Sequence, residues 1–267
     1  MLTVERRQAA SDLLYAQWRA GTLIDSLPAE LLPKTRADAY GVQALLEGRD
    51  MGALVGWKIA ATSLAGQKHI GVDGPLAGRI LAGTVIPHGA KCTLAKVHMK
   101  FAEAEFVFRM ARDLPPRATP YTHDEVMAAV AALHVGIEIP DSRFTNYTSN
   151  GPLQLICDNS CAHAFFLGPA CAARWRDVDL SGQATVGRVL GADGTAKLEW
   201  PGSGGNVLGD PRTALIWLAN ELAAYGVTLR AGQFVTTGTC VPPMPVAPGD
   251  TFWADFGELG KASLAFD

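Results

Sequence analysis

The sequence predicts an α+β fold in which an N-terminal helical part precedes a larger, strand-rich domain. The first 50 residues carry apolar side chains at helical spacing, whereas the chain from Ala53 onward breaks into short apolar runs separated by Gly and Pro. Only two later segments carry helix-capping signals. Helices gathered before the strands, rather than alternating with them, are typical of α+β proteins. We expect a helical and α+β part over residues 1–85 and the larger domain over residues 86–267.

Composition narrows the class of protein. The 267 residues are 48% hydrophobic and 18% charged, which is enough apolar material for a substantial core. A net charge of −3 and the lack of a Lys/Arg run exclude nucleic acid and a membrane surface as expected partners. The N-terminus has no signal-peptide pattern, and no apolar run approaches about 18 residues. We therefore expect a cytoplasmic protein that binds a small molecule.

The cysteines and histidines predict no zinc or disulfide chemistry. There are five cysteines, an odd number, and no CxxC pair is present. The six histidines lack HExxH or similar spacing. We expect reduced, buried, structural cysteines.

Two helices are predicted before Ala53. Leu13 and Trp18 belong to one periodic segment, and Thr35 with Asp38 resembles a capping box that opens a second. A proline-bearing link over residues 27–33 separates them.

Strands are predicted in four runs: LVGWKIAAT, AGTVIPHGA, CTLAKVHM and KFAEAEFVF. A capping box of Thr122 and Glu125 then predicts a helix carrying Val126, Val130 and Leu133, and the chain passes directly into the apolar run HVGIEIPDSRF.

The last helix is the most clearly marked. Asp210 is a good N-cap, Pro211 suits the first helical position, and an apolar stripe from Leu215 to Tyr225 runs up to Gly226. The tail from residue 234 returns to strands.

The run KFAEAEFVF places two carboxylates side by side on a strand. Successive side chains of a strand point to opposite faces, so residues 102, 104, 106 and 108 form an apolar face. Glu103 and Glu105 then share the other face with Phe101 and Val107. One interpretation is a solvated acidic face. The other is a metal site, because like charges on a partly buried face need protons or a cation, and oxygen ligands favour Mg²⁺ or Mn²⁺ over zinc.

A third carboxylate and a lysine stand in equally apolar surroundings. Glu138 lies between Ile137 and Ile139 in HVGIEIPDSRF, and Lys58 lies within the strand GWKIAATS. Glu138 is either the third ligand or an edge-strand side chain in water. Lys58 is either a desolvated lysine that exchanges a proton or a snorkelling one.

An ordered set of motifs resembles the fumarylacetoacetate hydrolase superfamily, within it the 2-keto-4-pentenoate hydratase and 4-oxalocrotonate decarboxylase branch. The motifs are GWKIAATS, GQKHIGVDGP, EAE, RDLP, EIPDSRF, DN before an apolar run ending at Gly168, GDP opening a helix with WLA, and TG followed by PGD. They span about residues 35 to 265.

The resemblance implies a mixed β-roll or sandwich domain with Mg²⁺ or Mn²⁺ on Glu103, Glu105 and Glu138, and a catalytic Lys58. It implies a 2-oxo or 2-hydroxy-dienoic acid substrate whose carboxylate and C2 oxygen bind the ion. It also implies a homo-oligomer built from dimers, in a branch whose hydratase and decarboxylase can associate.

Several positions depart from the branch pattern, at the end of the site where water would add. Leu76 and Ala77 stand where an acidic and an aromatic residue are usual, and DNAS becomes DNSC, ending in Ser160 and Cys161. We expect Ser160 to bind substrate, and Arg79, close to the first departure, to contact an anionic tail.

In TTGTC, Thr239 is a candidate hydroxyl donor to a substrate carboxylate, or only a turn residue. The predicted function is a metal-dependent hydro-lyase that converts a 2-hydroxy-2,4-dienoate into a 4-hydroxy-2-oxo acid in aromatic-compound catabolism. The alternatives are a 2-oxo diacid decarboxylase, an acylpyruvate-type C–C hydrolase, and a non-catalytic partner subunit.

Overall fold

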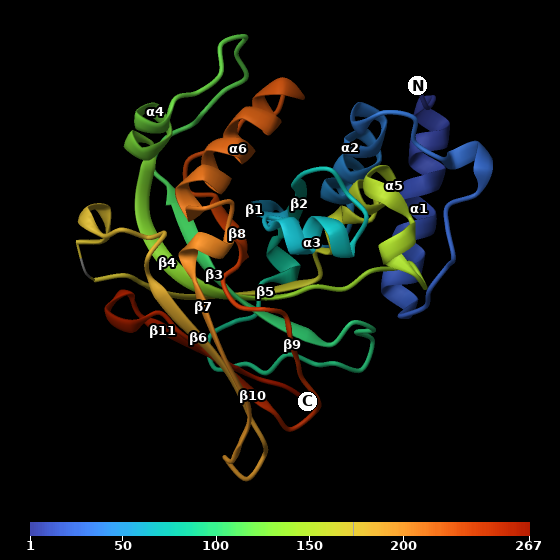
Figure 1. The fold of residues 1–267 in the computed structure, drawn as a ribbon. Helices are drawn as coiled ribbons and strands as arrows, with labels where there is room; N and C mark the ends of the chain where they lie inside the picture. The colour runs from blue at the N-terminus through green and yellow to red at the C-terminus, as the bar shows by residue number, and fades with distance from the viewer. Residues whose placement is uncertain (173) are drawn as a thin grey trace.

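The computed structural model describes residues 1–172 and 174–267 (Figure 1). The helices are α1 Val4–Ala20, α2 Arg36–Ala44, α3 Leu64–His69, α4 His123–Ala128, α5 Gly151–Cys157 and α6 Pro211–Ala224. The strands are β1 Leu54–Ala60, β2 Leu76–Leu81, β3 Phe101–Met110, β4 Val130–Ile139, β5 Ala164–Ala170, β6 Ala184–Leu190, β7 Ala196–Ser203, β8 Phe234–Thr239, β9 Met244–Pro245, β10 Thr251–Asp255 and β11 Lys261–Ala265.

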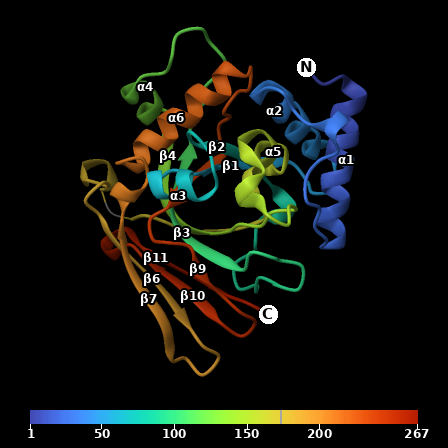
Figure 2. The ribbon, with the colours of Figure 1, turned by 45° about the vertical axis from the view of Figure 1, so that its right-hand side comes forward.

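The strands form two sheets. A seven-stranded sheet has the order β2-β1-β8-β3-β4-β5, with β9 on β3, and a four-stranded sheet has the order β11-β10-β6-β7. Strands β1 and β8 pair in parallel and the other strand pairs of the larger sheet are antiparallel, so this sheet is mixed. Helices α1, α2 and α5 gather at one side of it, α4 and α6 lie at the other, and α3 crosses in front in both views (Figures 1 and 2). This confirms the predicted α+β class with N-terminal helices.

The larger sheet includes both parts of the chain that the sequence suggested. Strands β1 and β2 lie before residue 86 and pair with each other, while β1 also pairs with β8 near the C-terminus. The expected division between residues 85 and 86 therefore falls within one sheet.

The apolar face predicted for β3 is the face that meets the second sheet. Ala102, Ala104, Phe106 and Phe108 are all fully buried. The ring of Phe106 packs edge-on against that of Phe256, which follows β10, with centroids 4.8 Å apart. The alternation of side chains along β3 therefore decides which face carries the two glutamates.

The capping box at Thr122 is present, but the helix it opens is shorter than predicted. The Thr122 side chain accepts from the Glu125 amide, and α4 ends at Ala128. Val130 and Leu133, expected on that helix, lie instead on β4 and are buried. The β-branched residues that follow favour a strand, and pairing with β3 supplies their backbone partners.

Two of the four expected strand runs are wrong. In AGTVIPHGA, Val85 forms a single bridge to Phe165, and in CTLAKVHM, Cys92 forms a single bridge to Phe266. Proline lacks the amide that a ladder needs, and here Pro87 interrupts the first run soon after its bridge.

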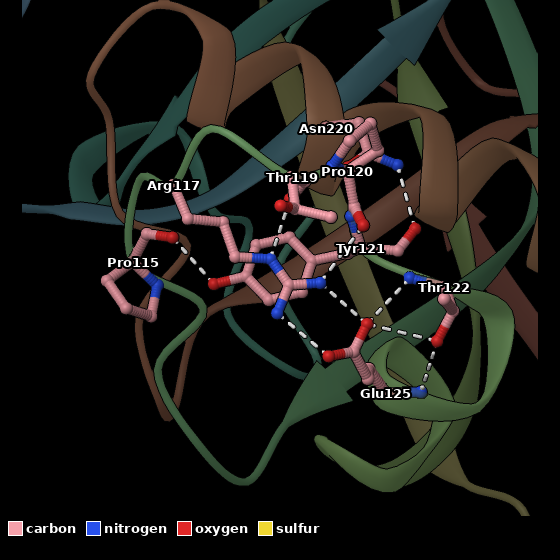
Figure 3. A network of polar contacts seen from close by, with 8 residues as sticks. All are labelled: Pro115, Arg117, Thr119, Pro120, Tyr121, Thr122, Glu125 and Asn220. Atoms are coloured by element: carbon pink, nitrogen blue, oxygen red, sulfur yellow. Dashed lines mark hydrogen bonds and ion pairs between the residues drawn. The ribbon is translucent and has the colours of Figure 1, made fainter.

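A network on the outer side of α4 holds the loop before it (Figure 3). The Arg117 guanidinium lies 3.7 Å from the Tyr121 ring centroid and donates to both Glu125 oxygens, at 2.8 and 2.6 Å. The Tyr121 amide donates to the Asn220 side chain at 2.6 Å, which links the loop to α6. Glu125 is thus fully partnered at the surface.

Over residues 1–172 and 174–267, none of the helices has the length and apolar character needed to cross a bilayer.

Candidate metal centre and catalytic cavity

Three carboxylates converge where β3 and β4 pair. Glu103 lies directly opposite Glu138 in the antiparallel register, and Glu105 lies opposite Gly136. One carboxylate oxygen of each glutamate lies within 4.8 Å of the others. Glu105 and Glu138 are each only 1% exposed, whereas Glu103 is half-buried.

Strand β8 holds Glu105 from the other side. The Thr236 hydroxyl and the Gly238 amide, at 2.7 Å, both donate to Glu105 Oε2. Gly238 has a φ of +104°, and a Cβ there would stand 1.9 Å from the Thr62 hydroxyl oxygen. Only glycine fits this position, because any side chain would collide with Thr62. The backbone can therefore come close enough for the Gly238 amide to hold the Glu105 carboxylate.

Lys58 reaches the cluster from β1. Its neighbour Trp57 points to the opposite face of the sheet, as alternation requires, and is fully buried. Lys58 Nζ lies 3.3 Å from Glu138 Oε2 and donates to the Ser160 carbonyl at 3.1 Å. The lysine is 4% exposed, so it is a buried ion-pair partner and does not snorkel to solvent.

A turn of left-handed residues positions that carbonyl. Asn159, Ser160 and Cys161 have φ values of 53°, 52° and 61°. The Asn159 amide side chain accepts from the Arg79 backbone N–H at 2.7 Å and donates to its carbonyl at 2.9 Å, as a neighbouring strand would. The Ser160 hydroxyl donates to the Ala77 carbonyl at 2.8 Å. These bonds offset the backbone strain and anchor the turn to β2.

Burial dominates the electrostatics of the cluster. It raises the pKa of Glu105 to about 8, with the Glu103 charge adding to the effect, and it raises the pKa of Glu138 well above its ordinary value. Burial opposes the charged form of Lys58, but the carboxylates of Glu138 and Glu103 outweigh it and raise its pKa. Three carboxylates with one ammonium keep a surplus of negative charge, so the cluster favours a cation or protons.

The unused oxygens fit a divalent ion. Glu105 Oε1 and both oxygens of Glu138 are buried and have no hydrogen-bond partner, and the Lys58 contact to Glu138 is an ion pair without hydrogen-bond alignment. Buried acceptors are rarely left unpartnered, because their desolvation is costly. An all-carboxylate donor set suits Mg²⁺ or Mn²⁺.

A cavity of about 600 Å³ opens onto the cluster. Lys58 and Glu103 line its inner end, together with Cys161, Gly238 and Thr239. Burial raises the pKa of the Cys161 thiol to about 12, so the thiol stays neutral. The size is that of a small-molecule site.

The structure brings some of the predicted substrate-binding residues to the cavity and not others. Thr239 lines it, although its hydroxyl donates to the Val241 carbonyl at 2.5 Å. Ser160 is fully buried and acts through its carbonyl on Lys58. Arg79 lies on the opposite face of β2, where it donates to Glu47 at 2.7 Å and stacks 4.8 Å from the Trp57 ring. It lines a separate cavity of about 200 Å³.

Sequence reasoning missed the residues that complete the site from β8, α3 and the turn over residues 147–149. Thr236 and Gly238 hold Glu105, and His69 and Tyr147 line the cavity, with the Tyr147 hydroxyl 3.5 Å from His69 Nε2. The pattern TTGTC carried one usable signal, a glycine inside a strand, which often marks a close approach of backbone to a ligand.

The fold and the carboxylate cluster together define an enzyme of the fumarylacetoacetate hydrolase type. Residues 80–265 match the family model described as fumarylacetoacetate (FAA) hydrolase C-terminal, and the chain belongs to this family.

Full-length relatives narrow the assignment to the hydratase and decarboxylase branch. The chain is 35% identical to the TodF product hydratase of Pseudomonas putida, over 96% of this chain and 94% of the relative. It is 29% identical to the 2-keto-4-pentenoate hydratase of Paraburkholderia xenovorans, over 100% of this chain and 97% of the relative. It superposes on the structure of 4-oxalocrotonate decarboxylase from Pseudomonas putida G7, complexed with magnesium and adipate, with a TM-score of 0.87, 28% identity and coverage of 100% and 99%. The resemblance drawn from the motifs is confirmed.

Proposed function

We propose that this protein is a metal-dependent hydro-lyase that adds water to a 2-hydroxy-2,4-dienoate and yields a 4-hydroxy-2-oxo acid. One observation carries the proposal: three carboxylates, two of which have unpartnered buried oxygens, converge with a buried lysine at the inner end of a single cavity. The hydratase names of full-length relatives support it.

Each residue has a role that follows from its position. Glu103, Glu105 and Glu138 would hold Mg²⁺ or Mn²⁺, which when bound supplies Lewis acidity to the C2 oxygen of the substrate. Lys58, held by Glu138 and the Ser160 carbonyl, is placed to donate or accept a proton there. Thr239 lines the same end, and its hydroxyl would hydrogen-bond the substrate carboxylate after turning away from the Val241 carbonyl.

The alternatives on this site differ in what they need. Acylpyruvate hydrolysis needs a base for the attacking water, commonly a histidine oriented by a carboxylate. Among the described cavity residues, His69 is the only histidine, and its partner is the Tyr147 hydroxyl. A non-catalytic subunit would have no use for an unpaired acidic cluster.

Metal response and turnover together test the proposal. Thermal stability should rise with Mg²⁺ or Mn²⁺, and Glu103→Gln and Glu138→Gln should lose most of that rise. Incubation with 2-hydroxypenta-2,4-dienoate should remove the dienol absorbance without releasing pyruvate. Unchanged metal responses in both variants would overturn the site, and pyruvate released from an acylpyruvate would overturn the reaction.

The proposal extends to assembly. A homo-oligomer built from dimers, able to associate with a decarboxylase partner, is proposed from the resemblance, and light scattering of the purified protein tests the first part.

A further inference from the structure

The cavity changes character along β3 and β4 as it leaves the carboxylates. Glu105, Glu103 and Phe101 occupy successive positions on one face of β3, and Pro140 comes directly after β4, two residues beyond Glu138. Exposure increases outward from Glu105, which is buried, to Phe101, which is half-buried. We define the outer wall as the apolar lining residues beyond the cluster: Ile70, Met99, Phe101, Pro140, Pro242 and Pro243.

The outer wall offers no fixed positive charge. Among the described residues that line the cavity, Lys58 alone carries a permanent one, and Glu138 and the Ser160 carbonyl already occupy it. The other polar lining side chains are the neutral ones of Thr62, Ser63, Asn206 and Thr239, together with His69 and Tyr147. His69 is exposed, and burial raises the pKa of Tyr147, so its hydroxyl stays neutral. A second carboxylate seated here would lose water without gaining a fixed countercharge, which is costly.

The volume exceeds what a five-carbon substrate fills. At about 30 Å³ per water molecule, the cavity of about 600 Å³ has room for roughly twenty waters. A five-carbon dienoate at the carboxylate cluster would leave most of the outer wall in contact with solvent. An apolar tail would cover that wall and remove apolar surface from water.

We propose that the cavity selects monocarboxylic substrates whose tail is neutral, mainly apolar and longer than that of a five-carbon dienoate. The inference rests on the proposed function, because it places the oxo-acid end of the substrate at Glu103, Glu105 and Glu138.

A pair of substrates with the same shape and different charge tests the inference. In 2-hydroxy-6-methylhepta-2,4-dienoate an isopropyl group replaces the second carboxylate of 2-hydroxyhexa-2,4-dienedioate. The isopropyl acid should show a kcat/KM at least about tenfold higher than the diacid, and no lower than that of 2-hydroxypenta-2,4-dienoate. Preference for the diacid, or for the five-carbon acid, would overturn the inference while leaving the hydratase intact.

A charge placed on the outer wall should reverse the preference. Ile70→Lys adds a cation to the wall and should raise kcat/KM for the diacid relative to the isopropyl acid by about tenfold. Leu64→Lys is the matched control, because Leu64 begins the helix that Ile70 caps, is 85% exposed and does not line the cavity. Equal changes in the two variants would count against the inference.

Binding of unreactive acids separates this inference from the proposed function. With Mg²⁺ present, calorimetry should show 6-methyl-2-oxoheptanoate binding more tightly than 2-oxohexanedioate. If no dienoate is turned over, the proposed function fails, and the order of these two affinities still decides the inference. Tighter or equal binding of the diacid, or no binding of the neutral acid, would overturn it.

Discussion

Glu105 and Glu125 have the same side chain in opposite surroundings. Glu125 lies at the surface, where the Arg117 guanidinium, followed by the Thr122 amide, lowers its pKa to about 2. Glu105 lies in the buried carboxylate cluster, where burial, followed by the Glu103 charge, raises its pKa to about 8. At the surface, the Arg117 guanidinium supplies a countercharge to Glu125. In the buried cluster, Glu103 places a second negative charge beside Glu105.

The difference shows which acidic residues serve the fold and which serve a ligand. Both oxygens of Glu125 accept hydrogen bonds from Arg117, and the residue holds a loop to a helix (Figure 3). Glu105 Oε1 is buried without a partner. A carboxylate that is satisfied within the chain stabilises structure, whereas an unsatisfied buried one is retained for something that binds.

Replacing Lys58 should produce the largest effect, because it removes the only cation from the buried cluster. Lys58→Met should lower kcat/KM by roughly 10²- to 10⁴-fold through loss of the proton donor. In metal-free protein it should also cost about 3–5 kcal/mol of unfolding free energy, since Glu138 is left buried and unpaired. Steady-state kinetics and denaturant unfolding measure the two effects.

Lys68→Met is the matched control for this change. Lys68 lies on α3, is exposed and does not line the cavity, so its replacement should alter neither quantity appreciably. If Lys58→Met retained parental kcat/KM, or if added Mg²⁺ did not recover part of its lost stability, the role given to Lys58 would be wrong.

Alternation along a strand made the centre of the site predictable from the sequence. KFAEAEFVF separates an apolar face from two carboxylates over consecutive residues, and the structure shows that apolar face fully buried. Glu138 and Lys58 stood out because each is charged within an apolar strand. Local patterns of this kind need no knowledge of the tertiary fold.

The strand register and the order of strands in the sheet could not be predicted from the sequence. Glu103 meets Glu138 because of the β3–β4 register, and Thr236 reaches Glu105 because β8 lies beside β3. Arg79 was judged by its closeness in sequence to the site, but neighbouring residues of a strand face opposite ways, and the face of β2 that carries it is turned away from the cavity. The early end of α4 likewise depends on pairing with β3.

Metal-free protein should show the unusual sign of the Glu105 titration. Folded protein keeps the Glu105 proton up to about pH 8, whereas the unfolded chain loses it near 4.5, so the folded state binds more protons between these values. Stability in chelator should therefore fall as pH rises through this window. Because one pKa unit corresponds to about 1.4 kcal/mol, the change should be on the order of a few kcal/mol.

Glu105→Gln should weaken this dependence and remove most of the metal response. In chelator, the unfolding temperature of the variant should fall less across the window than that of the parent and should be higher than the parent's at pH 8. The fall that remains comes from Glu138, whose pKa burial also raises, and added Mg²⁺ should stabilise the variant little. A parent protein whose chelated form becomes more stable between pH 4.5 and 8, with the variant following it, would show that Glu105 is not an uncompensated buried charge.

Glu125→Gln should give the smallest effect and the opposite sign. The pKa of Glu125 is about 2 in the folded state, against 4.5 in the unfolded chain, so its contribution is complete above pH 4.5 and is lost as pH falls toward 2. The variant should unfold roughly 1–2 °C below the parent near neutral pH, because the Arg117 pair is solvent-exposed and screened. That gap should close as pH falls through the window in calorimetric scans.

Asp124→Asn is the control, since the Asp124 side chain is 99% exposed, and it should shift the unfolding temperature less. A gap of constant size from pH 7 to 2 would mean that packing of the Arg117 loop, rather than the carboxylate charge, is what Glu125 contributes.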